Sequence, residues 1–209
     1  MKTQMRFQKY LCLAMIILGA IATLYAFCYC TGSMVKLGQT LDNSFESFFD
    51  ASDGKYDATL YVEIQSFNNL LMYFGIAMIL LAVLLYITSC NKRRNYYVSN
   101  YVAIGLCAGG NIVMSVVSLV LNGIWRSKFL NVDFVEWEAY WDNRIASRPG
   151  ANIVKQYSES TAAFDIGFVV YILVILASVA LILNLVWKIK LMQGEKKLLA
   201  NENLAGGVV

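Results

Sequence analysis

Four polar side chains recur at helical spacing within one apolar stretch of the chain. Asn111, Ser115, Ser118 and Asn122 are separated by four, three and four residues, which places them on one face of a helix. Amides and hydroxyls within a membrane must face protein or water rather than lipid. The stripe predicts hydrogen bonds between the helices of one bundle. The alternatives are the lining of a pore and a surface that docks another membrane subunit.

The same stretch carries two glycines four residues apart. Gly105 and Gly109 have no side chains, so a second helix can approach their backbone closely. Ser178 and Asn184, in a later apolar stretch, are further candidates for polar contacts between helices. These residues favour a role in contacts between helices rather than in catalysis.

Acidic residues gather in a charged segment near the amino-terminal third of the chain. Asp42, Glu46, Asp50 and Asp53 share one face of a predicted helix. A calcium loop with Gly54 at its sixth position is excluded, because its first, third and twelfth positions, Phe49, Ala51 and Leu60, supply no side-chain oxygen. We expect a solvated acidic face without a metal, with attraction of cations or of a basic protein as the alternative.

Aromatic residues accompany this acidic face and recur in a second charged segment. Phe45 and Phe48 share the opposite face of the first amphipathic helix, and Phe134, Trp137 and Trp141 share a face of another. Helices that lie on a membrane surface usually carry lysine and arginine, whereas these carry acids. The pattern favours an outer aromatic cap in which the two helices pack together. The alternatives are helices on the membrane surface or a face completed by another protein.

Groups that perform acid, base or nucleophilic chemistry are scarce. The chain has no histidine, and its five cysteines all lie in apolar stretches or at their ends. A membrane-embedded cysteine nucleophile would therefore lack a base beside it. We predict a non-enzymatic protein without cofactors and without a nucleic-acid partner.

The elements that position these residues are membrane-spanning helices. Hydrophobic residues make up 58% of the chain and charged residues 15%, against roughly 25% charged residues in an ordinary soluble domain. We predict one domain, an all-α integral membrane bundle of four helices with two outer loops that contain short amphipathic helices. The predicted spans cover residues 10–30, 67–90, 101–123 and 164–187, the outer loops 31–66 and 124–163, and the tail 188–209. Trp125 and Trp187 fall at opposite ends of spans, as aromatic anchors do.

The orientation follows from lysine and arginine around the short connections. Ten basic residues against two acids, Glu195 and Glu202, lie on the side that holds both termini. The basic residues are Lys2, Arg6, Lys9, Lys92, Arg93, Arg94, Lys188, Lys190, Lys196 and Lys197. The positive-inside rule places this side in the cytoplasm. We therefore expect a multi-pass protein of the plasma (cytoplasmic) membrane with both termini inside.

Two functions fit these features. The first is an accessory or assembly subunit of a larger membrane complex, because small and polar helix faces and an aromatic, acidic outer surface suit protein contacts. Its partners would be the lipid bilayer and either another protein or further copies of this chain. The alternative is a homo-oligomeric channel in which the stripe from Asn111 to Asn122 lines a pore.

Overall fold

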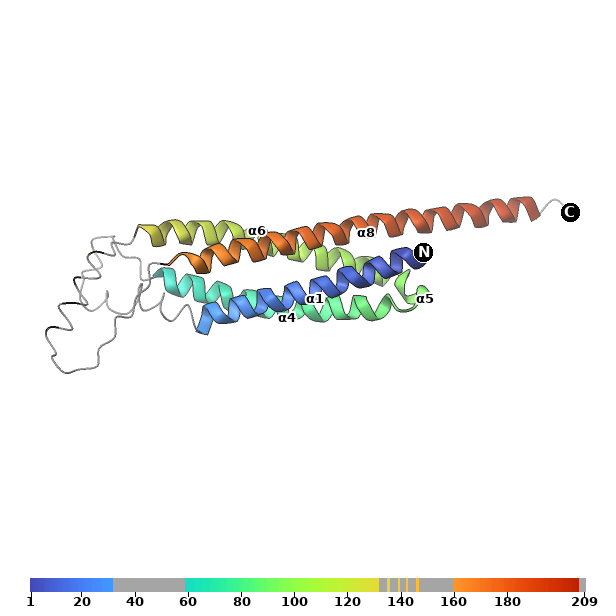
Figure 1. Cartoon of the computed structure of the whole chain (residues 1–209). Helices are drawn as coiled ribbons and strands as arrows, with labels where there is room; N and C mark the ends of the chain where they lie inside the picture. Colours follow the sequence, from blue (N-terminus) through green and yellow to red (C-terminus); the bar gives the residue numbers. More distant parts are fainter. Residues whose placement is uncertain are drawn as a thin grey trace. The chain divides into compact units, whose positions relative to one another are not determined.

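The computed structural model describes residues 1–31, 59–131 and 160–206, together with positions 135, 139, 142 and 146. Every element within these ranges is helical. The helices are α1 (Lys2–Thr31), α4 (Thr59–Thr88), α5 (Lys92–Asn95), α6 (Val98–Leu130) and α8 (Ala162–Gly206) (Figure 1). The residues of the predicted outer acidic face and of the outer aromatic cap lie outside the described residues.

Four of these helices are long and apolar enough to cross a membrane, as predicted. Backbone N–H and C=O groups in lipid must be satisfied within the same segment, and a continuous helix does this. Each helix extends beyond at least one end of its predicted span, most clearly α8, which continues from Trp187 to Gly206. Charge ends a membrane span but does not end a helix, because Lys, Glu and Gln are good helix formers.

The connection between α4 and α6 is a tight corner built around α5. Asn91 precedes α5, and its side-chain oxygen accepts a hydrogen bond from the Arg93 backbone N–H at 2.9 Å. At the end of α4, the hydroxyl of Ser89 donates to the Leu85 carbonyl at 2.7 Å. These short-range bonds satisfy backbone groups that a helix end leaves unpaired.

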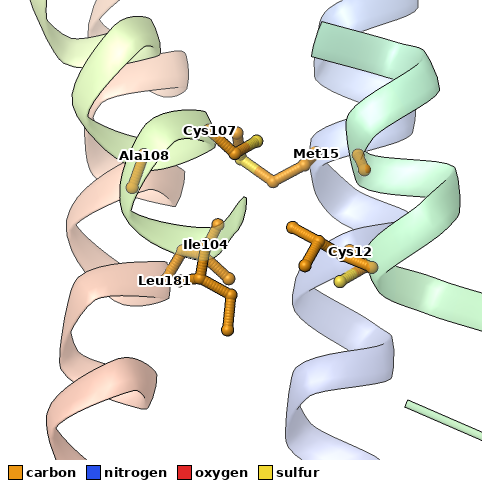
Figure 2. Packing of buried hydrophobic residues seen from close by; sticks show 8 residues of the cluster. Cys12, Met15, Ile104, Cys107, Ala108 and Leu181 are labelled. Atoms are coloured by element: carbon orange, nitrogen blue, oxygen red, sulfur yellow. The ribbon is translucent and has the colours of Figure 1, made fainter. Parts of the chain in front are cut away.

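The described chain divides into two compact units, each containing parts of α1, α4, α6 and α8. The first unit comprises Met1–Ala22, Phe74–Val117 and Val170–Val209. Cys107 of α6 and Met15 of α1 point toward one another in its core (Figure 2). The remaining buried members of this cluster are Cys12, Ala82, Leu85, Ile104, Ala108 and Leu181. Small residues in this core bring the helices close, which favours van der Waals packing in a membrane.

The second unit comprises Thr23–Tyr73 and Ser118–Val169 and has an aromatic core. Its buried residues are Ile64, Trp125, Phe129 and Phe164. The rings of Phe67 and Trp125 meet edge to face, with centroids 5.6 Å apart. Trp125 is only 6% exposed, so it is a core residue of this unit rather than the lipid-facing anchor that its place in the sequence suggests.

Candidate functional site

A cluster of buried amides surrounds one buried lysine in the first unit. We name the residues that form it the amide cluster: Gln4, Gln8, Asn95, Asn100, Asn184 and Lys188. They come from α1, α5, α6 and α8, and each is at most 4% exposed. The cluster therefore joins four separate helices through side chains that are withdrawn from solvent and lipid.

Two glutamines of α1 form the centre of the amide cluster. The Gln4 amide donates to the side-chain oxygens of Gln8, at 3.1 Å, and of Asn184, at 3.0 Å. The Gln4 oxygen in turn accepts from the Asn95 amide at 3.2 Å and from the Tyr96 hydroxyl at 2.9 Å. Because buried polar groups are costly when unpaired, these bonds stabilise one arrangement of the helices, and the Asn95 oxygen is the member of the cluster left without a partner among the described residues.

Lys188 supplies the only cation of the amide cluster and is completely buried. Its Nζ donates to the Gln8 oxygen at 3.1 Å and to the Asn100 oxygen. It also lies over the rings of Tyr96, 5.6 Å from the centroid, and Tyr101, at 4.9 Å. Among the described residues no carboxylate pairs with Lys188. Amide oxygens and aromatic faces thus take the place of a counter-ion.

Helical spacing brings these residues together. Gln4 and Gln8 are four residues apart on α1, and Asn184 and Lys188 are four apart on α8, so each pair lies on one helix face. Sequence reasoning assigned Lys188 to a solvated tail and considered neither glutamine. The sequence did contain one indication of the amide cluster. Polar side chains recur at a spacing of four residues near the basic ends of the first and fourth spans.

A groove of about 350 Å³ lies beside the amide cluster. It is lined by Tyr96, Val98, Tyr101, Ile189, Met192, Gln193 and Lys196. Burial, followed by the neighbouring Tyr101 and Glu195, raises the pKa of Tyr96 to about 12. The Tyr96 hydroxyl therefore stays protonated at neutral pH and remains a donor to Gln4.

The first half of the predicted polar stripe is buried in the first unit. Asn111 is 7% and Ser115 4% exposed, so neither faces lipid. The Asn111 amide donates to the Cys107 sulfur of its own helix at 3.7 Å. Ser178 likewise bonds within its own helix, to the Val174 carbonyl, whereas Asn184 belongs to the amide cluster. The expected contacts between helices are thus found at Asn184 and not at Ser178.

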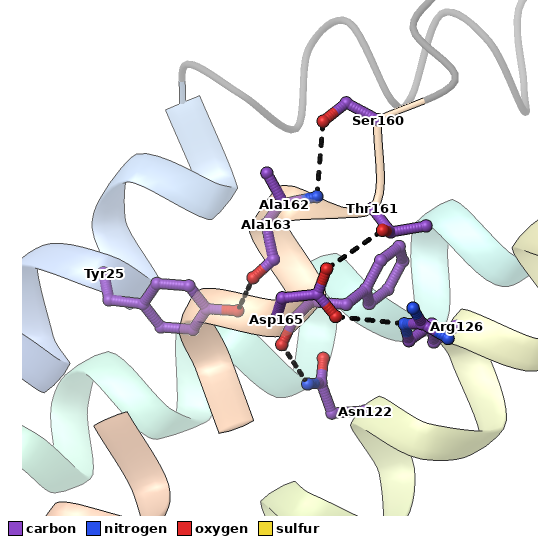
Figure 3. A network of polar contacts seen from close by, with 9 residues as sticks. Tyr25, Asn122, Arg126, Ser160, Thr161, Ala162, Ala163 and Asp165 are labelled. Atoms are coloured by element: carbon purple, nitrogen blue, oxygen red, sulfur yellow. Dashed lines mark hydrogen bonds and ion pairs between the residues drawn. The ribbon is translucent and has the colours of Figure 1, made fainter. Parts of the chain in front are cut away.

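The second half of the stripe is buried in the second unit, where Ser118 is 1% and Asn122 4% exposed. The Asn122 amide donates across to the Phe164 carbonyl of α8 at 2.7 Å. Tyr25 of α1 donates its hydroxyl to the neighbouring Ala163 carbonyl at 2.8 Å (Figure 3). Asn122 therefore makes a hydrogen bond between helices, of the kind predicted for the stripe.

In the second unit, the first turn of α8 carries a charged residue, Asp165, that pairs with Arg126. The Asp165 carboxylate accepts from Arg126 Nε at 3.1 Å and from the Thr161 hydroxyl at 3.0 Å (Figure 3). A carboxylate in the first turn also interacts favourably with the helix dipole. Both charged side chains are substantially exposed, so we assign this pair a modest structural role.

Glycines of the first unit fall into two groups. A Cβ on Gly19 would lie 2.9 Å from the Ile79 side chain, so Ile79 would have to shift, and one on Gly110 would make close contact with Phe74 at 3.4 Å. A Cβ on Gly105 or Gly109 would meet nothing within 4 Å. The predicted close approach at Gly105 and Gly109 is therefore not made by the chain's own described helices.

No group of three or more histidine, cysteine or acidic side chains placed to hold a metal occurs in the part of the chain that the structure describes. Comparisons with protein-family models, with curated proteins and with solved structures found no match for this chain. Its function has to be inferred from its own residues.

Proposed function

We propose that this chain is a non-enzymatic integral membrane protein that acts as an accessory or assembly subunit. The observation that carries the proposal is the open pair of glycines on α6. Glycine within a helix costs roughly 1 kcal/mol relative to alanine. At Gly105 and Gly109 the chain's own packing leaves room for alanine, so internal packing gives no reason for glycine there.

The residues around this pair form a surface suited to another transmembrane helix. Val102 and Val116 lie on the same face of α6 and are 55% and 47% exposed. Valine in a helix has essentially one rotamer, so packing it against a partner costs little side-chain entropy. Small residues flanked by such rigid side chains favour close helix association in lipid. The proposed partner is a membrane helix of another protein or of a second copy.

Burial of the polar stripe gives the homo-oligomeric channel less support. Asn111, Ser115, Ser118 and Asn122 are each at most 7% exposed within the single chain. Side chains that line a pore between subunits would instead be accessible in one isolated chain. Bilayer recordings on the purified protein test the alternative directly, because cation-selective currents that change in Asn111→Leu would favour it.

The assembly proposal predicts that Gly105→Leu and Gly109→Leu weaken recovery of the partner or of a dimer by about tenfold. The measurement is cross-linking in membranes, followed by purification in gentle detergent and quantitative mass spectrometry. Each leucine blocks the close approach, whereas its Cβ meets no described atom within 4 Å, so the thermal midpoint of the isolated protein should not fall.

Ala77→Leu is the matched control for these variants. Ala77 is an exposed small residue on α4, outside the proposed contact, so the same enlargement should leave association intact. A wild-type chain that remains monomeric and recovers no stoichiometric partner would contradict the proposal. Equal loss in all three variants would also contradict it.

We further propose that the protein lies in the plasma membrane with both termini in the cytoplasm. Support comes from the ten basic residues at the ends of the spans on one side. In a background without native cysteines, Ser52→Cys and Ser147→Cys should react with an impermeant thiol reagent in intact cells. Ser99→Cys should react only after permeabilisation. Reaction of Ser99→Cys in intact cells would reverse the orientation.

A further inference from the structure

The groove beside the amide cluster presents hydrogen-bond donors without acidic side chains. Gln193 and Lys196 of α8 line it, and Tyr101 of α6 lines the facing wall. Tyr101, Gln193 and Lys196 make no hydrogen bond or ion pair with the described residues. Glu195, the acid next to this wall, is engaged with Lys92 at 3.4 Å. The donors that remain fit a ligand with several acceptor oxygens and negative charge.

The Lys188 amine lies directly behind the groove. Tyr96 and Tyr101 form part of the groove wall, and Lys188 Nζ lies over both of their rings. Lys188 is completely buried, whereas Lys196 is exposed at the groove. The positive charge that attracts an anion into the groove is therefore that of Lys196.

The remaining groove wall is apolar. Val98, Ile189 and Met192 supply aliphatic surface next to the donors, and Val98 is 78% exposed. The groove lies where the apolar part of α8 gives way to Lys190, Lys196 and Lys197. A freely soluble anion gains no binding energy from apolar side chains. A phospholipid carries both a phosphate and hydrocarbon chains, and it places them where the charged and apolar parts of α8 meet.

We propose that this groove binds the phosphate headgroup of an anionic phospholipid. Lys196 and Tyr101 donate to the phosphate oxygens, Gln193 donates to the headgroup or glycerol oxygens, and the first part of an acyl chain packs against Ile189 and Met192. This site shares no residue with the Gly105 and Gly109 surface, and its argument does not rest on the assembly proposal.

Native mass spectrometry of the purified full chain tests the site. The protein is titrated with phosphatidylglycerol or phosphatidylcholine of identical acyl chains, and the affinity for the first retained lipid is measured. We expect phosphatidylglycerol to bind at least about tenfold more tightly. Lys196→Gln should weaken it about fivefold and Tyr101→Phe about threefold, through loss of one charge and of one donor.

Neighbouring residues supply matched controls. Lys197→Gln removes the same charge one position away and Tyr97→Phe removes an exposed hydroxyl, and neither residue lines the groove. Both should keep their affinity within twofold, and Gly109→Leu, about two turns from Tyr101 on α6, should also bind phosphatidylglycerol normally. Equal retention of the two lipids, or equal loss in Lys196→Gln and Lys197→Gln, would overturn the proposal. Displacement of phosphatidylglycerol by an equal concentration of glycerol phosphate would overturn the lipid assignment in favour of a soluble phosphate compound.

Discussion

Replacing Asn100 with leucine should lower the free energy of unfolding by about 1.5–3 kcal/mol, the range for a hydrogen bond to a charged group. The Asn100 oxygen accepts from the buried Lys188 ammonium and from the Gln8 amide. Leucine leaves the cation with fewer acceptors in a site that water does not reach, and an uncompensated buried charge is expensive. Unfolding in mixed micelles, followed by circular dichroism, provides the measurement.

Asn111→Leu is the matched control because it makes the same replacement on the same helix. The Asn111 amide bonds only weakly, to a sulfur 3.7 Å away, and interacts with no charge. Its loss should cost less than about 1 kcal/mol, as neutral hydrogen bonds in membrane bundles do. A second test combines Asn100→Leu with Lys188→Met. Removing the cation should make this double variant more stable than the sum of the single effects, and simple additivity would contradict the role given to Lys188.

Gly167→Ala should destabilise the protein by about 2 kcal/mol, through overpacking of the second unit. A Cβ at Gly167 would overlap the Tyr25 hydroxyl and would lie 3.2 Å from the Asn122 amide nitrogen. Neither side chain can move freely, because Tyr25 is bonded to the Ala163 carbonyl and Asn122 to the Phe164 carbonyl. Displacing them breaks both bonds, which outweighs the roughly 1 kcal/mol that alanine gains over glycine in a helix.

The stability change expected for Gly167→Ala is compared with that of Gly105→Ala, measured on the isolated chain. Its Cβ meets nothing within 4 Å, so only the helix propensity of alanine acts there and stability should stay the same or rise. Thermal unfolding of both variants in one detergent measures the difference. Destabilisation of Gly105→Ala as large as that of Gly167→Ala would show that the two positions are not packed as described.

Hydropathy predicted the four long helices well, because in lipid length and composition almost determine a spanning helix. Side-chain partners were harder to predict. The stripe at Asn111, Ser115, Ser118 and Asn122 is buried within the described chain, and helical spacing alone groups its members on one face. Which helix each residue meets depends on packing between segments far apart in the sequence, and periodicity carries no such information.

Lys188 illustrates this limit most clearly. A lysine just beyond an apolar span normally extends toward the headgroups, so sequence reasoning placed it in the tail. Its burial depends on acceptors that α1 and α6 supply, at Gln8 and Asn100. Trp125 was misjudged for a similar reason, because its ring meets Phe67 of α4 rather than the membrane interface.

The amide cluster also has a consequence for how the protein is made. Gln4 and Gln8 are synthesised before their partners Asn184 and Lys188, which follow 180 positions later. At 5–20 residues per second, a ribosome needs roughly ten to forty seconds to cover that interval. After α5 and α6 have been made, the two glutamines have their partners Asn95, Tyr96 and Asn100 but still lack those that α8 supplies. The polar contacts of the amide cluster can therefore be completed only after α8 has been synthesised.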